Sequence, residues 1–221
     1  MWLIPISIAM EKHAIVPTRT ARFEKGISVG HAALKQPSRM TVEEFLAWDG
    51  DADTRYELAG GEVFAMAPPS VAHGGIIVNL AINVGTKLRP PCKAIAEVGI
   101  CLPDRDDTFY QADLAVSCSP RTPGEHYLEA PVVIIEVLSP GTAGFDRGTK
   151  VPDYRTIPSV REIALASSTE IKLEIWHRTP DGWKVTDVVD EKAIICLASI
   201  DVEIPLSAIY DGVVFEAEKT G

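Results

Sequence analysis

The chain has 221 residues, of which 46% are hydrophobic and 24% are charged, an ordinary composition for a soluble globular protein with room for one large domain or two small ones. Its formal net charge of −10 is unevenly distributed: residues 1–39 hold six of the 21 Lys/Arg and two of the 31 Asp/Glu, which leaves 15 and 29 for residues 40–221. Such an acidic body excludes nucleic-acid binding through bulk positive charge, so any contact of that kind must be local.

The first ten residues, MWLIPISIAM, are apolar, but no basic segment precedes them, and Glu11 and Lys12 follow. The stretch is short for a membrane span and lacks a small-residue cleavage site, so we predict neither a signal peptide nor a membrane anchor. Residues 11–39 show no apolar periodicity. We therefore expect residues 1–39 to form a flexible tail that contributes little to the core, followed by one domain over residues 40–221.

A helix signal and a hairpin signal open this domain. Thr41, with Glu44 three residues later, is a capping-box pattern and predicts a short helix that ends near Trp48. In the stretch RYELAGGEVFAM, two alternating runs flank Gly60 and Gly61, which predicts a β-hairpin.

Strands dominate the rest of the domain. The apolar residues of 70–88 recur near helical spacing and predict an amphipathic helix, and a further helix is predicted near residues 146–157. Strands are predicted over residues 93–102, 110–117, 131–138, 160–167, 172–178 and 183–189. Helices come early, strands come later and one helix lies between strands, which favours an α+β (mixed α/β) fold around one sheet.

The four cysteines, Cys92, Cys101, Cys118 and Cys196, form no C-x-x-C pair and have no zinc-finger spacing. In a chain of this length we interpret them as free and mostly buried thiols. Free thiols are typical of a reducing compartment, so the predicted location is cytoplasmic.

Two carboxylates interrupt strands that are otherwise apolar. Glu136 stands near the end of VVIIEVLSP, a run typical of a central strand covered on both faces, and Asp113 stands in YQADLAV. Functional groups of open sheets gather beyond the carboxyl ends of strands, and carboxylate oxygens suit Mg²⁺ or Mn²⁺. The alternative is a structural pair of carboxylates bonded to Arg or to backbone amides.

The segment DRGTKVPDY places Asp146, Lys150 and Tyr154 four residues apart, on one face of the helix that follows the Glu136 strand. A lysine beside a metal-bound water orients that water and stabilises charge on a phosphoryl group. The alternative is an exposed Asp146–Lys150 salt bridge. Pro152 is tolerated only in a first helical turn, which moves the predicted helix start to near Lys150 and Asp146 into the preceding loop.

Six stretches occur in a set order: RYELAGGEVFAM, AHGGIIVNL, ADLAV, VVIIEVLSP, D-x-x-x-K-x-x-x-Y and IPSVREIAL. Together they resemble the Uma-two (Uma2) family of restriction-endonuclease-like proteins, within the PD-(D/E)XK nuclease superfamily. The resemblance covers residues 40–215, approximately the whole predicted domain. It implies a restriction endonuclease-like fold with one mixed, curved β-sheet and flanking helices.

The resemblance also implies roles for individual residues. Asp113 and Glu136 match the metal ligands, and Glu57 matches an early acidic position that adds a ligand or positions a water. Lys150 matches a catalytic lysine that sits on the helix after the strand. In the common superfamily pattern that lysine stands two residues after the glutamate, where this chain has Leu138.

Three further residues match positions beside such a site: His73, Asp146 and Tyr154. Local hydrogen bonding at a helix start is the simpler interpretation of His73, and core packing is the simpler interpretation of Tyr154. Ala112 stands where the family usually has Pro, a departure that affects strand geometry more than chemistry.

These patterns predict an endonuclease that hydrolyses DNA phosphodiester bonds with Mg²⁺ or Mn²⁺, with no membrane association. The sequence is compatible with a homodimer. One alternative is a catalytically inactive protein of the same fold that acts as an interaction or nucleic-acid-binding module. A second is a metal-independent glycoside hydrolase in which Asp113 and Glu136 act as acid and base.

Overall fold

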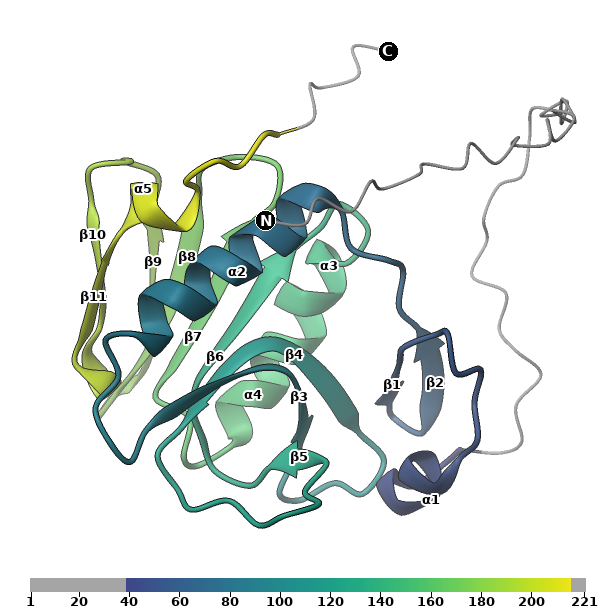
Figure 1. Cartoon of the computed structure of the whole chain (residues 1–221). Helices are drawn as coiled ribbons and strands as arrows, with labels where there is room; N and C mark the ends of the chain where they lie inside the picture. Colours follow the sequence, from purple (N-terminus) through teal and green to yellow (C-terminus); the bar gives the residue numbers. More distant parts are fainter. Residues whose placement is uncertain (1–38, 216–221) are drawn as a thin grey trace, which may run out of the picture. The chain divides into compact units, whose positions relative to one another are not determined.

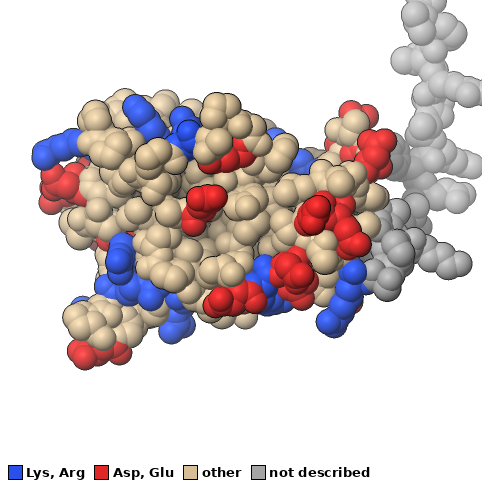
Figure 2. Space-filling model, turned by 90° about the horizontal axis from the view of Figure 1, so that it is seen from below, with Lys and Arg blue, Asp and Glu red and all other residues tan. Residues whose placement is uncertain are grey.

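The computed structural model describes residues 39–215 (Figure 1). The predicted flexible tail, residues 1–39, lies outside the described residues except for Arg39. No helix within residues 39–215 is long and apolar enough to cross a membrane. On the face drawn in Figure 2, acidic and basic side chains are interspersed and do not separate into single-sign regions.

The first elements form as the sequence predicts. α1 (Val42–Ala47) begins at a complete capping box, in which the Thr41 side chain accepts a hydrogen bond from the Glu44 N–H and the Glu44 carboxylate accepts one from the Thr41 N–H. β1 (Tyr56–Ala59) and β2 (Glu62–Ala65) pair as an antiparallel hairpin. Its turn residues, Gly60 and Gly61, have φ of +59° and +80°, a conformation that favours glycine.

One mixed sheet organises the domain, which confirms the predicted fold class. The sheet has the order β2-β1-β4-β6-β7-β8-β9, with β3 on β4 and β5 on β3. The β6–β7 and β3–β5 pairs are parallel and the others are antiparallel. The strands are β3 (Lys93–Cys101), β4 (Phe109–Ser117), β5 (Tyr127–Leu128), β6 (Pro131–Leu138), β7 (Glu162–Ser167), β8 (Leu173–Thr179) and β9 (Gly182–Val188).

β6 is the central strand, and apolar layers cover both of its faces. On one face, called the α2 face, Val133 and Ile135 share a core with α2 (Val71–Gly85). On the other, called the α4 face, Ile134 shares a core with α4 (Val151–Thr156). Two-sided burial requires a strand without polar alternation, which residues 132–135 provide, so this prediction is confirmed.

The sequence did not predict the elements that complete the α2 face. A two-stranded sheet, β10 (Ile194–Leu197) and β11 (Val202–Pro205), packs there (Figure 1). A 3₁₀ turn, η2 (Ala198–Ile200), joins its strands, and α5 (Leu206–Ile209) follows them. Their runs of apolar residues are too short to show a period of their own.

The helix before α4 starts earlier than Pro152 suggested. α3 (Ala143–Phe145), a π turn, η1 (Asp146–Lys150), and α4 form one continuous helical segment, so the expectation that Asp146 lies in a loop is wrong. Proline has no N–H, and its ring clashes with the carbonyl four residues earlier in a regular α-helix. The wider π turn, in which the Val151 N–H donates to the Asp146 carbonyl, precedes the proline and accommodates it.

The interpretation of the cysteines as free thiols is wrong for two of the four, since Cys101 and Cys196 are free. Cys92 and Cys118 form a disulfide, Cys101 is partly buried and Cys196 is exposed. The β3–β4 register sets Lys93 opposite Ser117 and so brings the flanking cysteines together, although 26 positions separate them in the sequence. A disulfide removes the basis on which the cysteines indicated a reducing compartment.

A substitution at Gly99 tests how closely β3 packs between β4 and β5. It pairs with Gln111 on β4 and Tyr127 on β5, and a Cβ atom at this position would overlap the His126 carbonyl oxygen and the Phe109 ring. We expect Gly99→Ala to lower the free energy of unfolding by about 1 to 3 kcal/mol, measured by chemical denaturation.

The control is Gly74→Ala in α2, where a Cβ atom would meet nothing within 4 Å. Because alanine favours the helix, this variant should gain up to about 1 kcal/mol. A Gly99→Ala protein as stable as wild type would show that β5 does not hold this close position.

Candidate active site

The candidate site lies where β4 and β6 separate. Their ladder runs from Ser117 opposite Pro131 to Leu114 opposite Ile135 and then stops. The next residues in register are Asp113 and Glu136. Here side chains replace the backbone ladder, because the Asp113 N–H donates to Glu136 Oε2 (3.3 Å) and the Val137 N–H donates to Asp113 Oδ2 (2.6 Å). Each carboxylate thus satisfies a backbone amide of the opposite strand.

This arrangement corrects the expected position of the site. β4 and β6 are antiparallel, so their carboxyl ends lie at opposite edges of the sheet. Asp113 is in the middle of β4, and Glu136 is two residues before the end of β6. The two carboxylates meet inside the sheet, in the gap between separating strands, and not beyond the strand ends.

Glu57 occupies a similar gap between β1 and β4. These strands share one pair, Leu58 opposite Phe109, and beyond it the Gln111 N–H donates to Glu57 Oε1 (2.8 Å). Carboxylates on three strands therefore bond to backbone groups that a continuous ladder would have used.

Lys150 joins these carboxylates to the helical segment. Its Nζ is 2.7 Å from Glu57 Oε1, 3.4 Å from Glu136 Oε1 and 3.6 Å from Asp146 Oδ1. The Lys150 side chain is 4% exposed, so the alternative of a solvent-exposed Asp146–Lys150 salt bridge is wrong. Tyr154, one turn further along, donates from its hydroxyl to Glu136 Oε1 (2.6 Å).

His73 reaches the site from the α2 face. Ser70 caps α2 by accepting a hydrogen bond from the His73 N–H, which fixes the first turn. His73 Nε2 lies 3.4 Å from Asp113 Oδ2. Its Nδ1 is buried and has no hydrogen-bond partner among residues 39–215. The structure thus brings Glu57, Asp113, Glu136 and Lys150 together with the three residues that the resemblance placed beside them, His73, Asp146 and Tyr154.

Sequence reasoning missed Tyr110. Its hydroxyl donates to Asp153 Oδ2 (2.6 Å), and its ring centroid is 5.7 Å from Lys150 Nζ. The only signal in the sequence is an aromatic residue three positions before Asp113, which is also what a core strand shows.

The electrostatics of the cluster are dominated by burial and by Lys150. Burial raises the pKa of Glu136, the Lys150 charge opposes that rise, and Asp113 and Asp146 add to it. Burial alone would lower the pKa of Lys150, but Glu136, Glu57 and Asp146 together raise it above its ordinary value. Lys150 is therefore charged at neutral pH, and the cluster has more carboxylates than cations.

The donor set fits a hard divalent cation. Asp113 and Glu136 supply carboxylate oxygens from adjacent strands, and the surplus of carboxylates favours a positive ion. No group of three or more His, Cys, Asp or Glu side chains within residues 39–215 is arranged to hold a metal. Mg²⁺ commonly keeps several waters and binds one or two carboxylates, so a pair of ligands is sufficient.

Comparisons with known proteins agree with the fold and with the resemblance. A model of the Uma2 family, described as "Putative restriction endonuclease", matches residues 42–207. Two Synechocystis proteins, both named "Uncharacterized protein" (slr1290 and sll1609), are 26% and 25% identical over 190 and 163 residues. These matches cover 85% and 71% of this chain, and 100% and 91% of the relatives.

A solved structure shares the fold. It is titled a "putative nuclease belonging to DUF820" from Anabaena variabilis and matches with a TM-score of 0.65 at 17% identity, over 79% of this chain and 99% of that one. The predicted restriction endonuclease-like architecture is thereby confirmed.

Removing the lysine tests how much the carboxylates depend on it. Lys150→Met leaves Glu57, Glu136 and Asp146 buried without their shared cation, so we expect a loss of about 3 to 5 kcal/mol in the free energy of unfolding at neutral pH. The loss should shrink in acid, where the carboxyl groups are protonated. Chemical denaturation at both pH values measures this, with exposed Lys192→Met as the control. A loss that does not vary with pH would indicate a packing defect instead.

Glu136→Gln tests the cost of ionising Glu136 in metal-free protein. A carboxyl group whose pKa is raised on folding stabilises the protein below its unfolded pKa, near 4.5, and loses that contribution as the pH rises. The variant cannot ionise. Its free energy of unfolding should therefore rise relative to wild type between about pH 4.5 and the folded pKa of Glu136, about 8, and then level off. The slope should be at most about 1.4 kcal/mol per pH unit.

Denaturation in EDTA over a pH series checks this expectation. If the variant instead loses several kcal/mol at neutral pH, Glu136 is a structural partner of Lys150 and Tyr154.

Proposed function

The chain belongs to the Uma2 family, and we propose that the cluster around Lys150 is the catalytic site of an endonuclease that hydrolyses DNA phosphodiester bonds with Mg²⁺ or Mn²⁺. The observation that supports this most directly is the meeting of Glu57, Asp113, Glu136 and Lys150 where the strands separate. These residues lie on β1, β4, β6 and the helical segment. They meet where the backbone ladders of β4 with β1 and with β6 are interrupted.

Asp113 and Glu136 are the residues that would hold the cation. A bound cation of this kind lowers the pKa of its water and polarises a phosphate. The hydrogen bonds from Val137 N–H to Asp113 and from Tyr154 to Glu136 hold each carboxylate in one orientation. Fixed ligands need no reorganisation when the ion enters.

Lys150 supplies the positive charge that a phosphoryl group needs. Its pKa is raised by the surrounding carboxylates, so it keeps its proton at neutral pH and acts as a charged donor. Glu57 and Asp146 hold its ammonium group from the β1 and π-turn sides. His73, beside Asp113, positions that ligand from the α2 face.

A second candidate function is a non-enzymatic module of the same fold. The near-complete burial of Lys150 and Glu136, both 4% exposed, favours it, because an ion cluster closed to solvent can serve stability alone. A metal-independent glycoside hydrolase is less well supported, because an acid–base pair of Asp113 and Glu136 gives no role to the buried Lys150, whose Nζ lies 3.4 Å from Glu136 Oε1. Metal binding and metal-dependent DNA cleavage together distinguish the nuclease from both.

With DNA as the substrate, the compartment we propose is the cytoplasm. The proposal depends on the substrate class alone, because Cys92 and Cys118 are bonded to each other and no longer indicate free thiols.

Asp113→Asn tests the metal site directly. The variant keeps an oxygen that can accept the Val137 N–H, so the fold should survive, but it loses the charge that holds a divalent cation. We expect Mn²⁺ titration calorimetry to show binding to wild type and none to the variant, and we expect Mn²⁺-dependent cleavage of plasmid DNA to disappear with it.

The matched control is Glu174→Gln. It removes a carboxylate on β8 that is also largely buried but pairs with Arg147 instead of Lys150. It should bind Mn²⁺ as wild type does. Equal Mn²⁺ affinity in wild type and Asp113→Asn would refute the proposed ligand set.

A further inference from the structure

A cluster of arginines and tryptophans lies on the α4 face, outside the candidate site. We call it the arginine patch, and it consists of Arg155, Arg161, Arg178, Trp176 and Trp183. Arg161 lies beside Arg178, because the Arg178 N–H donates to the Arg161 carbonyl (2.8 Å). The Arg178 guanidinium lies 4.6 Å from the centroid of the Trp183 ring, and that of Arg155 lies 5.4 Å and 5.9 Å from the Trp176 and Trp183 rings. Such contacts hold guanidinium groups in place without neutralising them.

Arg178 has a structural role within the patch. Its Nε donates to the Val160 carbonyl (2.7 Å), and its Nη2 donates to the Arg155 and Ile157 carbonyls (2.9 Å each). These carbonyls lie at and just after the carboxyl end of α4, where a positive charge is favourable. Arg178 is therefore satisfied by the protein itself.

Arg155 and Arg161, which are partly exposed and exposed respectively, have no such partners in the described part of the protein. Within residues 39–215, neither guanidinium has a hydrogen-bond acceptor or lies within 4.0 Å of a carboxylate oxygen. The strand register places Glu174 opposite Asp187, two pairs from Trp176 and four from Arg178. These carboxylates already pair with Arg147 and Lys172. The guanidinium donors of these two arginines are thus accessible to a ligand from solvent.

The charges also lie close enough to repel one another. Burial, and then the charges of Arg161 and Arg155, lower the pKa of Arg178. An anion bound between these groups would relieve that repulsion and supply the missing acceptors. The patch is a local concentration of positive charge in a chain whose net charge is −10.

We propose that the arginine patch binds the phosphodiester backbone of DNA. Phosphate oxygens are acceptors that guanidinium groups bind in a bidentate manner, and a row of phosphates suits several arginines at once. The assignment of DNA rests on the proposed nuclease function. One helical segment directs Lys150 and Tyr154 into the candidate site and Arg155 into the patch, so the two sites keep a fixed relation.

Binding of a short fluorescein-labelled DNA duplex, measured by fluorescence anisotropy in EDTA over a salt series, tests this patch. The Arg155→Gln/Arg161→Gln variant should bind DNA up to about tenfold more weakly for each arginine lost, and the slope of log affinity against log salt should fall by about one per arginine. Arg155→Lys/Arg161→Lys keeps both charges and should retain most of the slope. Its result separates charge from packing.

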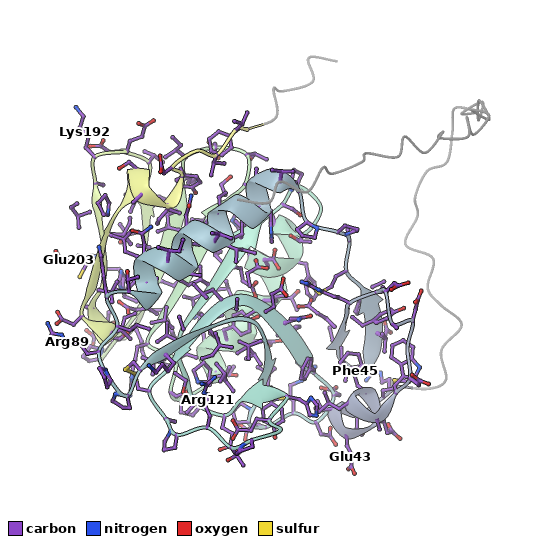
Figure 3. All side chains as sticks on the ribbon, viewed as in Figure 1. Glu43, Phe45, Arg89, Arg121, Lys192 and Glu203 are labelled. Atoms are coloured by element: carbon purple, nitrogen blue, oxygen red, sulfur yellow. A yellow bond between two sulfur atoms is a disulfide. The ribbon has the colours of Figure 1, made fainter. Side chains whose placement is uncertain are left out.

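The control is Arg89→Gln/Lys192→Gln. It also removes two positive charges, but from residues on the side of β10 and β11 (Figure 3). It should bind as wild type does. Equal affinity and slope in the patch and control variants would overturn the proposal, as would wild-type protein that binds no DNA in EDTA.

Cleavage of DNA in Mn²⁺ separates this inference from the proposed function. Patch-dependent binding without any cleavage would leave the patch in place and remove the nuclease assignment. Cleavage with DNA binding that does not depend on the patch would remove the patch alone.

Discussion

The ammonium group of Lys150 is the interaction on which the candidate site depends. It lies within 4 Å of carboxylates from β1, β6 and its own helical segment, and it is almost fully buried. Several carboxylates this close together would repel one another and resist burial without a shared cation. Lys150 therefore does two things at once: it makes an acidic cluster tolerable inside the fold, and it ties the helical segment to the sheet.

The sheet contributes to the site because the backbone ladder between β4 and β6 stops before Asp113 and Glu136. A continuous ladder between β4 and β6 would have used the amides of Asp113 and Val137 and left no place for the carboxylates to turn inward. Because side-chain oxygens bond to those amides instead, the strands separate without leaving buried donors unsatisfied. His73 on one face and Lys150 on the other can then reach the same gap, which a closed sheet would not allow.

Charge is divided between two places on the α4 face. The cluster around Lys150 has carboxylates in excess, which suits a cation, while Arg155 and Arg161 have donors in excess, which suits an anion. An acidic protein that acts on DNA needs such a division, because bulk charge repels the phosphates. The π turn before Pro152 matters here, because it keeps the helical segment continuous from Lys150 to Arg155.

The sequence by itself determined the local features. Thr41 and Glu44 specify the capping box, and Gly60 and Gly61 specify the hairpin turn. The apolar run of 132–135 specifies a central strand, and each of these features depends on neighbouring residues alone. It also singled out the charged residues of the site, since carboxylates within apolar strands are costly unless they have a partner.

Only the tertiary structure decided how those parts meet. The antiparallel register of β4 and β6 sets Asp113 opposite Glu136, and the β3–β4 register brings Cys92 to Cys118. Register depends on contacts between segments far apart in the chain, which no local pattern encodes. The helix start before Pro152 was decided in the same way, because burial of Asp146 and Lys150 against the sheet outweighs the local preference of proline for a first turn.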